Sequence, residues 1–240
     1  MRRAAAVLAL LGALGAAGCQ STQDKSAKLA AQATGLERQQ GVTITRENAD
    51  VKVLGTSVLT DANGSAVVVR LDNTAKATQV DVPVAVTVKS AADRAVFTND
   101  APGLDKSLTH AFVLPSGESV WVNDQVFATE KPRSAEARVG APEASAPASL
   151  PDLRVTGVRL DQDPVSGLSA VGVVSNPSAE LQQKVLVTAL ARKGGKVVAA
   201  GRGVVPKIKP GKRARFRVFF IGSPKGAEVT VTAQPTRIAP

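Results

Sequence analysis

Cysteine and histidine supply many of the nucleophiles, bases and metal ligands in proteins, and each occurs once in this chain of 240 residues, as Cys19 and His110. Nucleophilic catalysis needs a nucleophile, a base and a group that orients the base. His110 begins the segment HAFVL, which reads as a strand with the histidine at its surface-exposed end. The chain has neither a Gly-x-Ser-x-Gly nor a Ser-x-x-Lys motif. We therefore predict no catalytic residues and no enzymatic activity.

The surroundings of Cys19 indicate a different use for its thiol. A cationic start at Arg2 and Arg3 is followed by an uncharged apolar run from Ala4 to Gly18, as in a secretory signal peptide. The run is shorter than the ~20 residues of a membrane-spanning helix. The segment LGAAGC resembles the bacterial lipobox, although Ala16 stands where leucine is commonest. This resemblance implies a diacylglyceryl group on the thiol, cleavage before Cys19 and acylation of the new amino terminus.

Lipidation of Cys19 predicts the location of the protein. A single acyl chain binds a protein to a membrane only marginally, whereas two or more chains anchor the protein stably. We expect a protein anchored by its lipid to the cell membrane, on the extracytoplasmic face. The alternative is an ordinary signal peptide with an incidental cysteine. No disulfide can form within a chain that has one cysteine, and no cofactor or metal is expected besides the covalent lipid.

Composition divides the chain into five segments. Residues 1–18 are the predicted signal peptide, and 19–40 are the lipidated cysteine with a polar tether. Residues 41–131 form a first domain and 151–240 a second. Between them, 132–150 is rich in Pro, Ala and Ser, a composition that favours a disordered, extended linker.

Both predicted domains are all-β. Segments such as VKVLGTSVLT and VDVPVAVTVKS alternate apolar and polar residues, and turn residues separate them. The two halves also share landmarks in the same order: Asn73 aligns with Asn176, Val82 falls near Val185, and a Ser-Ala-Val run starting at Ser65 matches one in the second half. We predict two tandem immunoglobulin-like antiparallel β-sandwiches. The only tryptophan, in the strand-like segment ESVWVND, is expected in a core.

The second domain resembles the bacterial FxLYD-type domain. A strand ending in Asn176, a second strand, a Gly-Gly turn into a Val-Val strand and a Pro-Gly turn carry the resemblance. The tyrosine and aspartate that name the family are replaced by Ala191 and Arg192. The resemblance covers less than half of the chain and implies an extracytoplasmic accessory module without a shared catalytic site.

One segment has a partial calcium-loop pattern. Asp61, Asn63 and Ser65 alternate as oxygen ligands would, but Ala66 occupies the position where such loops need glycine. Asn63-Gly64 between two alternating segments favours a type I′ hairpin turn instead. No metal ligands are therefore assigned.

Charge is distributed unevenly between the two halves. Residues 149–240 contain 15 Lys and Arg against 5 Asp and Glu, whereas 41–131 contain 8 against 11. Within the segment PKIKPGKRARFRV, period-two alternation places Arg213, Arg215 and Arg217 on one face of a strand. We predict that this basic surface contacts an anionic lipid surface, an acidic cell-wall polymer or an acidic envelope protein. The remaining predicted contacts are the nearby lysines Lys207, Lys209 and Lys212, with Lys207 and Lys209 expected on the adjacent strand.

The basic surface also has an explanation that involves no partner. Arginines on an outer strand can be solvated residues that keep an edge strand from aggregating. Nucleic acid is excluded as a partner because few aromatic residues are present to stack on bases. The sequence thus favours a non-catalytic binding or accessory lipoprotein of the cell envelope. The alternatives are a structural spacer without a ligand and an envelope hydrolase with an unrecognised carboxylate site.

Overall fold

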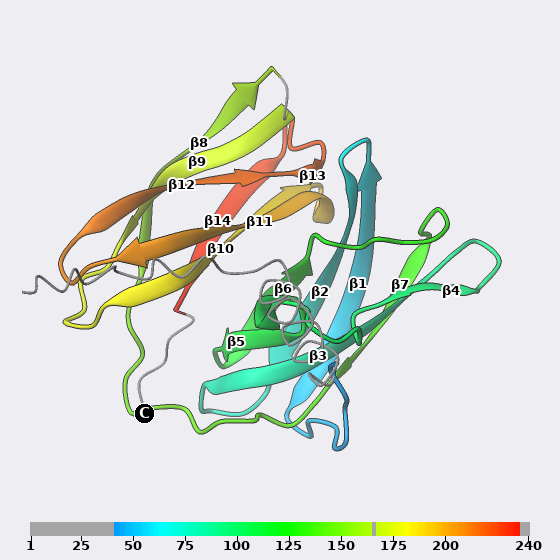
Figure 1. Cartoon of the computed structure of the whole chain (residues 1–240), viewed down its shortest axis with the longest axis horizontal. Coiled ribbons are helices and arrows are strands. Elements are labelled where there is room, and N and C mark those ends of the chain that lie inside the picture. The colour runs from blue at the N-terminus through cyan, green and yellow to red at the C-terminus, as the bar shows by residue number, and fades with distance from the viewer. Residues whose placement is uncertain (1–40, 165–166, 236–240) are drawn as a thin grey trace, which may run out of the picture. The chain divides into compact units, whose positions relative to one another are not determined.

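The computed structural model describes residues 41–164 and 167–235, which are nearly all β-structure (Figure 1). All strand pairs are antiparallel, and the sheets stack around apolar cores without closing into a barrel. The predicted fold class, all-β with antiparallel sandwiches in tandem, is therefore confirmed. The contacts divide the chain between Gln39 and Gln40. The predicted signal peptide, Cys19 and tether lie outside the described residues.

The first seven strands, here called the first repeat, form two sheets. One sheet has the order β1-β2-β6, and the other is built around β3. Strands β4 and β7 lie on opposite sides of β3, since Val88 pairs with Phe97 of β4 and with Ala135 of β7. The 3₁₀ turn η1 precedes β5. The bounds are β1 Val51–Asp61, β2 Gly64–Asn73, β3 Gln79–Lys89, β4 Ala95–Thr98, η1 Lys106–Leu108, β5 His110–Leu114, β6 Gly117–Asn123 and β7 Ser134–Val139.

The last seven strands, the second repeat, reproduce this plan. One sheet has the order β8-β9-β12 and the other β13-β11-β10-β14. Strands β8, β9 and β12 correspond to β1, β2 and β6, while β10, with β11 on one side and β14 on the other, corresponds to β3. The bounds are β8 Arg154–Asp163, β9 Gly167–Ser175, β10 Gln182–Lys193, β11 Lys196–Ile208, β12 Arg213–Phe219, β13 Ile221–Gly222 and β14 Glu228–Gln234.

Two fully buried asparagines occupy equivalent places in the repeats. The amide of Asn73 donates to the carbonyls of Ala77 and Leu114, each at 3.0 Å. The amide of Asn176 donates to the carbonyls of Glu180 (2.7 Å) and Ile208 (3.1 Å). Each asparagine thus closes the loop that follows it and ties that loop to the end of the opposite sheet. The alignment of Asn73 with Asn176 is correct, whereas the Ser-Ala-Val match was one residue out of register.

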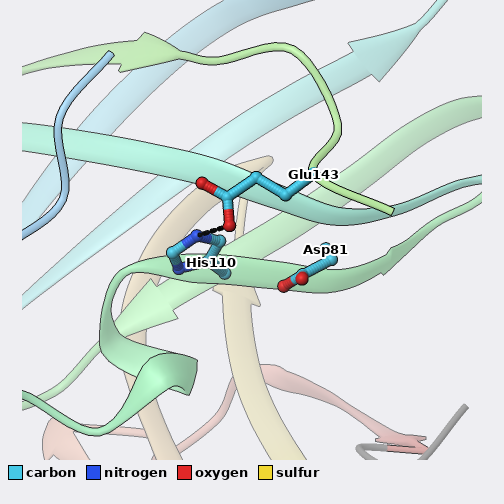
Figure 2. Close-up of side chains that lie close together, drawn as sticks. All are labelled: Asp81, His110 and Glu143. Carbon is cyan, nitrogen blue, oxygen red and sulfur yellow. Dashed lines mark ion pairs between the residues drawn. The ribbon is translucent and has the colours of Figure 1, made fainter. Parts of the chain in front are cut away.

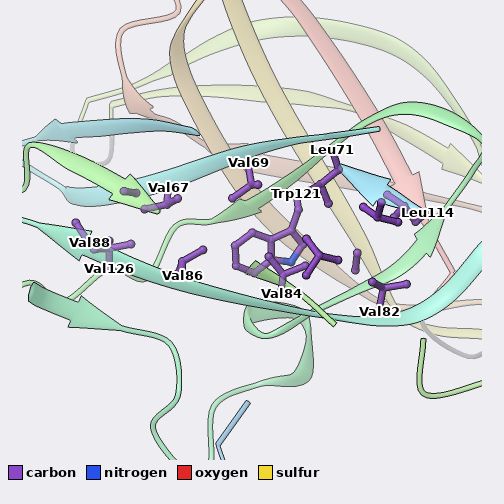
Figure 3. Close-up of a cluster of buried hydrophobic side chains, with 14 of the residues drawn as sticks. Val67, Val69, Leu71, Val82, Val84, Val86, Val88, Leu114, Trp121 and Val126 are labelled. Atoms are coloured by element: carbon purple, nitrogen blue, oxygen red, sulfur yellow. The ribbon is translucent and has the colours of Figure 1, made fainter. Parts of the chain in front are cut away.

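The core of the first repeat consists mainly of valines from two facing strands (Figure 3). Alternate residues of β2, from Val67 to Leu71, face alternate residues of β3, from Val82 to Val88, and all are buried. Burying a valine side chain stabilises a fold by ~1.5–3 kcal/mol. Trp121 lies between the strands and is 5% exposed, as predicted. Its indole N–H donates to the carbonyl of His110 at 3.2 Å.

The predicted linker was wrong over part of its length. Ser134–Val139 forms strand β7, which pairs with Val84–Lys89 of β3. Its small apolar residues face inward and its charged residues outward, where the carboxylate of Glu136 lies 2.6 Å from the ammonium of Lys89. Pairing with β3 provides partners for the backbone hydrogen-bonding groups of this segment. The first repeat therefore extends to Gly140 and not to Lys131.

The β1–β2 hairpin is present, but its turn is not of type I′. Asp61 pairs with Gly64, so the turn residues are Ala62 and Asn63, and neither has the positive φ that a type I′ turn requires. The Asp61 carboxylate accepts a hydrogen bond of 2.7 Å from the Asn63 N–H and so stabilises the turn from its own side chain.

The two repeats contact each other through a small apolar cluster. Val68 and Val122 of the first repeat pack with Leu190 and Ala200 of the second. Polar contacts flank this cluster, among them a buried ion pair in which the Arg202 Nε lies 3.0 Å from an Asp124 oxygen. The repeats are thus in direct contact and are not joined only by the connecting chain.

Candidate functional site

Strand β12 carries the three arginines that the sequence placed on one face. Arg213, Arg215 and Arg217 are exposed, while Phe216 and Val218 are buried in the core of the second repeat. The predicted alternation is confirmed. Gly172 on β9 makes room for the Phe216 ring, because a Cβ at this glycine would lie 2.7 Å from a ring carbon. The buried aromatic ring therefore fixes which face of β12 points outward.

The strand register adds two arginines that the sequence analysis missed. Arg213 and Arg154 of β8 both pair with Ser175 of β9, and Arg217 and Arg159 of β8 both pair with Val171. Directly paired residues share a face of a sheet, and Arg154 and Arg159 are exposed. We call this surface the arginine face; its members are Arg154, Arg159, Arg213, Arg215 and Arg217.

The arginine face is only partly neutralised by its own carboxylates. The Arg217 guanidinium lies 2.7 Å from an Asp161 oxygen and 5.8 Å from the centroid of the Phe219 ring. Arg154 pairs with Asp152 at 2.9 Å. Within the described residues, no carboxylate forms an ion pair with the other three arginines of the face. The surface therefore has a net positive charge over three adjacent strands.

The predicted lysines lie beside this face. Lys207, Lys209 and Lys212 are exposed, but Lys207 belongs to β11, which is part of the opposite sheet and does not pair with β12. Lys209 and Lys212 lie in the β11–β12 turn, where the Lys212 N–H donates to the Lys209 carbonyl at 3.0 Å. The expectation that Lys207 and Lys209 share the neighbouring strand was thus wrong. The lysines extend the positive surface from the end of β12 and not across the sheet.

A second group of charged residues surrounds His110 in the first repeat (Figure 2). The expectation of a surface histidine was wrong, since His110 is 9% exposed. Strand β3 pairs with His110 through Pro83. The side chain of Glu143, from the segment after β7, lies over the imidazole, with 3.2 Å between Nε2 and a carboxylate oxygen. The burial arises from residues distant in sequence, which the strand pattern around His110 does not reveal.

Asp81 completes this group from β3. One oxygen each of Asp81 and Glu143 and one ring nitrogen of His110 lie within 4.8 Å of one another. The Lys106 ammonium lies 2.5 Å from an Asp81 oxygen and 3.8 Å from a Glu143 oxygen. The other Asp81 oxygen and the His110 Nε2 are buried and make no hydrogen bond within the part of the chain that the structure describes. We call Asp81, His110 and Glu143 the histidine cluster.

Comparison of the sequence with family models and with curated proteins found no match in either case. Among the residues that the structure describes, no helix combines the length and the apolar character needed to cross a membrane. We therefore infer the function from the chain's own residues.

Proposed function

We propose that this protein is a lipid-anchored, extracytoplasmic lipoprotein that acts as a non-catalytic binding module. The proposed anchor is the lipid on Cys19, and the proposed binding surface is the arginine face. The observation that carries the proposal is the set of three arginines, Arg159, Arg213 and Arg215, that share one exposed sheet face without an ion pair among the described residues.

The charge of the arginine face has an energetic cost that an anionic partner would offset. Like charges on adjacent strands repel each other. Guanidinium groups bind phosphate and carboxylate through paired hydrogen bonds, with a geometry that lysine does not offer. An exposed sheet face suits an extended charged surface better than a small ligand, which binds in a concave site. A lipid anchor at Cys19 would hold the domain near the membrane, so anionic phospholipid is the first partner to test, before an acidic cell-wall polymer or an acidic envelope protein.

The test compares vesicle binding by two charge-matched variants. Residues 20–240 include every residue that the structure describes and lack the lipid. Arg213→Ser/Arg215→Ser removes two charges from the face, and Lys52→Ser/Lys76→Ser removes two exposed charges from the first repeat. Each basic residue near an anionic surface contributes ~1 kcal/mol, so the arginine variant should bind phosphatidylglycerol vesicles about thirty-fold more weakly. The lysine variant should lose much less of its affinity for these vesicles.

Salt dependence and alternative surfaces complete the test. Binding through exposed charges should weaken as ionic strength rises. Equal losses in the two variants would show that only net charge matters and would refute the arginine face as a site. Retention on purified cell wall but not on vesicles would identify the polymer as the partner. Absence of binding to both at low salt would favour the structural spacer.

A further inference from the structure

We propose that the histidine cluster, Asp81, His110 and Glu143, binds a divalent transition-metal ion of the zinc class. This site is separate from the arginine face and does not depend on the proposed docking function. One imidazole nitrogen and two carboxylate oxygens are ligands that Zn²⁺ accepts. The nitrogen ligand disfavours Ca²⁺ and Mg²⁺, which bind oxygen.

The buried imidazole is the observation that points to a ligand. His110 is 9% exposed, and its buried Nε2 points at Glu143, 3.2 Å from a carboxylate oxygen, in an orientation that makes no hydrogen bond among the described residues. The opposite nitrogen, Nδ1, lies 2.8 Å from the Thr109 hydroxyl. Histidines that bind metal through one ring nitrogen are commonly held by a hydrogen bond at the other. The buried Asp81 oxygen without a partner offers a second ligand.

Lys106 already places a positive charge at the cluster. Its ammonium lies between the two carboxylates, 2.5 Å from Asp81 and 3.8 Å from Glu143. The Lys106 side chain is 49% exposed, so it can turn into solvent when another cation binds. A metal ion would therefore replace the ammonium as the charge that neutralises these carboxylates.

The second repeat shows that the cluster is not part of the common scaffold. Asp81 and Lys184 occupy the same irregular position in β3 and β10, with φ of 55° and 49°. Pro83 pairs with His110 in the first repeat, and the corresponding pair in the second is Leu186 with Val204. Lysine and valine cannot bind a metal ion here. The backbone feature is thus shared, whereas among the described residues the ligand set occurs only in the first repeat.

A bound metal ion would fasten the connecting segment to the first repeat. Glu143 lies in the segment between β7 and β8, and its N–H donates to the Asp81 carbonyl at 3.0 Å. Ala144 forms an isolated bridge with Val80. Coordination by the Glu143 side chain would add a metal-dependent link to these backbone contacts.

The first measurement is metal binding by the full-length chain in detergent, stripped of metal with a chelator. A Cys19→Ser background removes the only thiol. Titration with Zn²⁺ should show one site, and Ca²⁺ and Mg²⁺ should not compete for it. His110→Gln and Glu143→Gln should each weaken binding by at least about tenfold. Glu136→Gln is the control, since Glu136 is an exposed carboxylate on β7 that pairs with Lys89 of β3. Lys106→Met should strengthen binding, because it removes the competing charge.

Two readouts show whether the variants fold and where the metal acts. Trp121 is the only tryptophan and donates to the His110 carbonyl, so its emission reports whether the first repeat is native. Zn²⁺ should raise the thermal midpoint seen by Trp121 and slow amide exchange in residues 141–146. The proposal is overturned if natively folded protein binds no Zn²⁺, or if His110→Gln and Glu143→Gln bind Zn²⁺ as the parent does. Weaker Zn²⁺ binding by Lys106→Met would also overturn it.

Discussion

The ion pair between Arg202 and Asp124 should be a main contribution to the contact between the repeats. The side chains are 6% and 17% exposed. The Arg202 guanidinium donates to Asp124 at 3.0 Å, and to the carbonyl and hydroxyl of Ser107 at 2.8 and 3.0 Å. The Arg202 backbone N–H donates to the other Asp124 oxygen at 2.8 Å. Arg202→Met keeps this last bond and much of the side-chain volume but removes the charge.

The expected cost of Arg202→Met follows from what it leaves unpaired. Asp124 would keep one backbone hydrogen bond and lose its buried counter-charge. Removal of one partner from a buried pair costs ~3–5 kcal/mol, whereas exposed pairs contribute ~0–1 kcal/mol. Because Asp124 is 17% exposed and keeps one bond, we expect about 3 kcal/mol. The double variant Arg202→Met/Asp124→Asn leaves no unpaired charge and should recover part of this loss.

Urea denaturation gives the assay, with two probes that separate the repeats. Trp121 fluorescence reports on the first repeat, and circular dichroism reports on both. Arg202→Met should lower the free energy of unfolding by about 3 kcal/mol, and Arg70→Met, which breaks the exposed pair with Glu118 at 3.2 Å, is the control. A loss below about 1 kcal/mol, equal to that of the control, would refute the reasoning and show that water reaches the pair.

Two further predictions concern single polar side chains. Gln182 is fully buried, and among the described residues neither atom of its side-chain amide has a hydrogen-bond partner. Gln182→Met should therefore raise the free energy of unfolding by about 1–3 kcal/mol. Gln79→Met should lower it, because Gln79 accepts a 2.7 Å hydrogen bond from Asn48. Urea denaturation compares the two variants, and a loss of stability in both would contradict the expectation. Burial acts to raise the pKa of Asp105, but hydrogen bonds from the Ser107 hydroxyl and N–H, together with the nearby charges of Arg202 and Lys184, outweigh it and hold that pKa below its ordinary 3.8. The stabilisation by ionised Asp105 should therefore be complete above about pH 5 and decline as the pH falls below about 4. The measurement is the difference in free energy of unfolding between the wild type and Asp105→Asn. A difference that stays constant from pH 6 to about pH 3 would contradict the expected pH dependence.

The features predictable from sequence are those set by near neighbours in the chain. Alternation assigned the outward face of β12 because Phe216 and Val218 need burial while the intervening arginines do not. The order of landmarks around Asn73 and Asn176 predicted the repeat, because the same loop must be closed in each. Strand β7 was not predicted because the alanines at its inward positions are only weakly hydrophobic, so they contrast little with the charged residues at its outward positions.

The features that could not be predicted depend on register between distant strands. Arg154 joins Arg213 on one face only because both pair with Ser175. His110 is buried because Glu143 and β3 reach it from elsewhere in the chain. Local patterns show which face of a strand points outward, but they do not show which strands are neighbours. Both candidate sites were therefore incomplete, or absent, in the sequence analysis.

Equivalent positions on β6 and β12 carry valine in the first repeat and arginine in the second. Counted from Asn73 and Asn176, Val68 corresponds to Val171, and their partners across the sheet are Val122 and Arg217. By the same count Val120 corresponds to Arg215. In the first repeat these valines pack into the apolar cluster that contacts the second repeat. In the second repeat Arg215 and Arg217 are exposed at the equivalent positions, where apolar side chains would lack a cover and favour aggregation. The two repeats thus use one sheet face in two ways: the first for contact within the chain, and the second, by our proposal, for contact with an anionic partner.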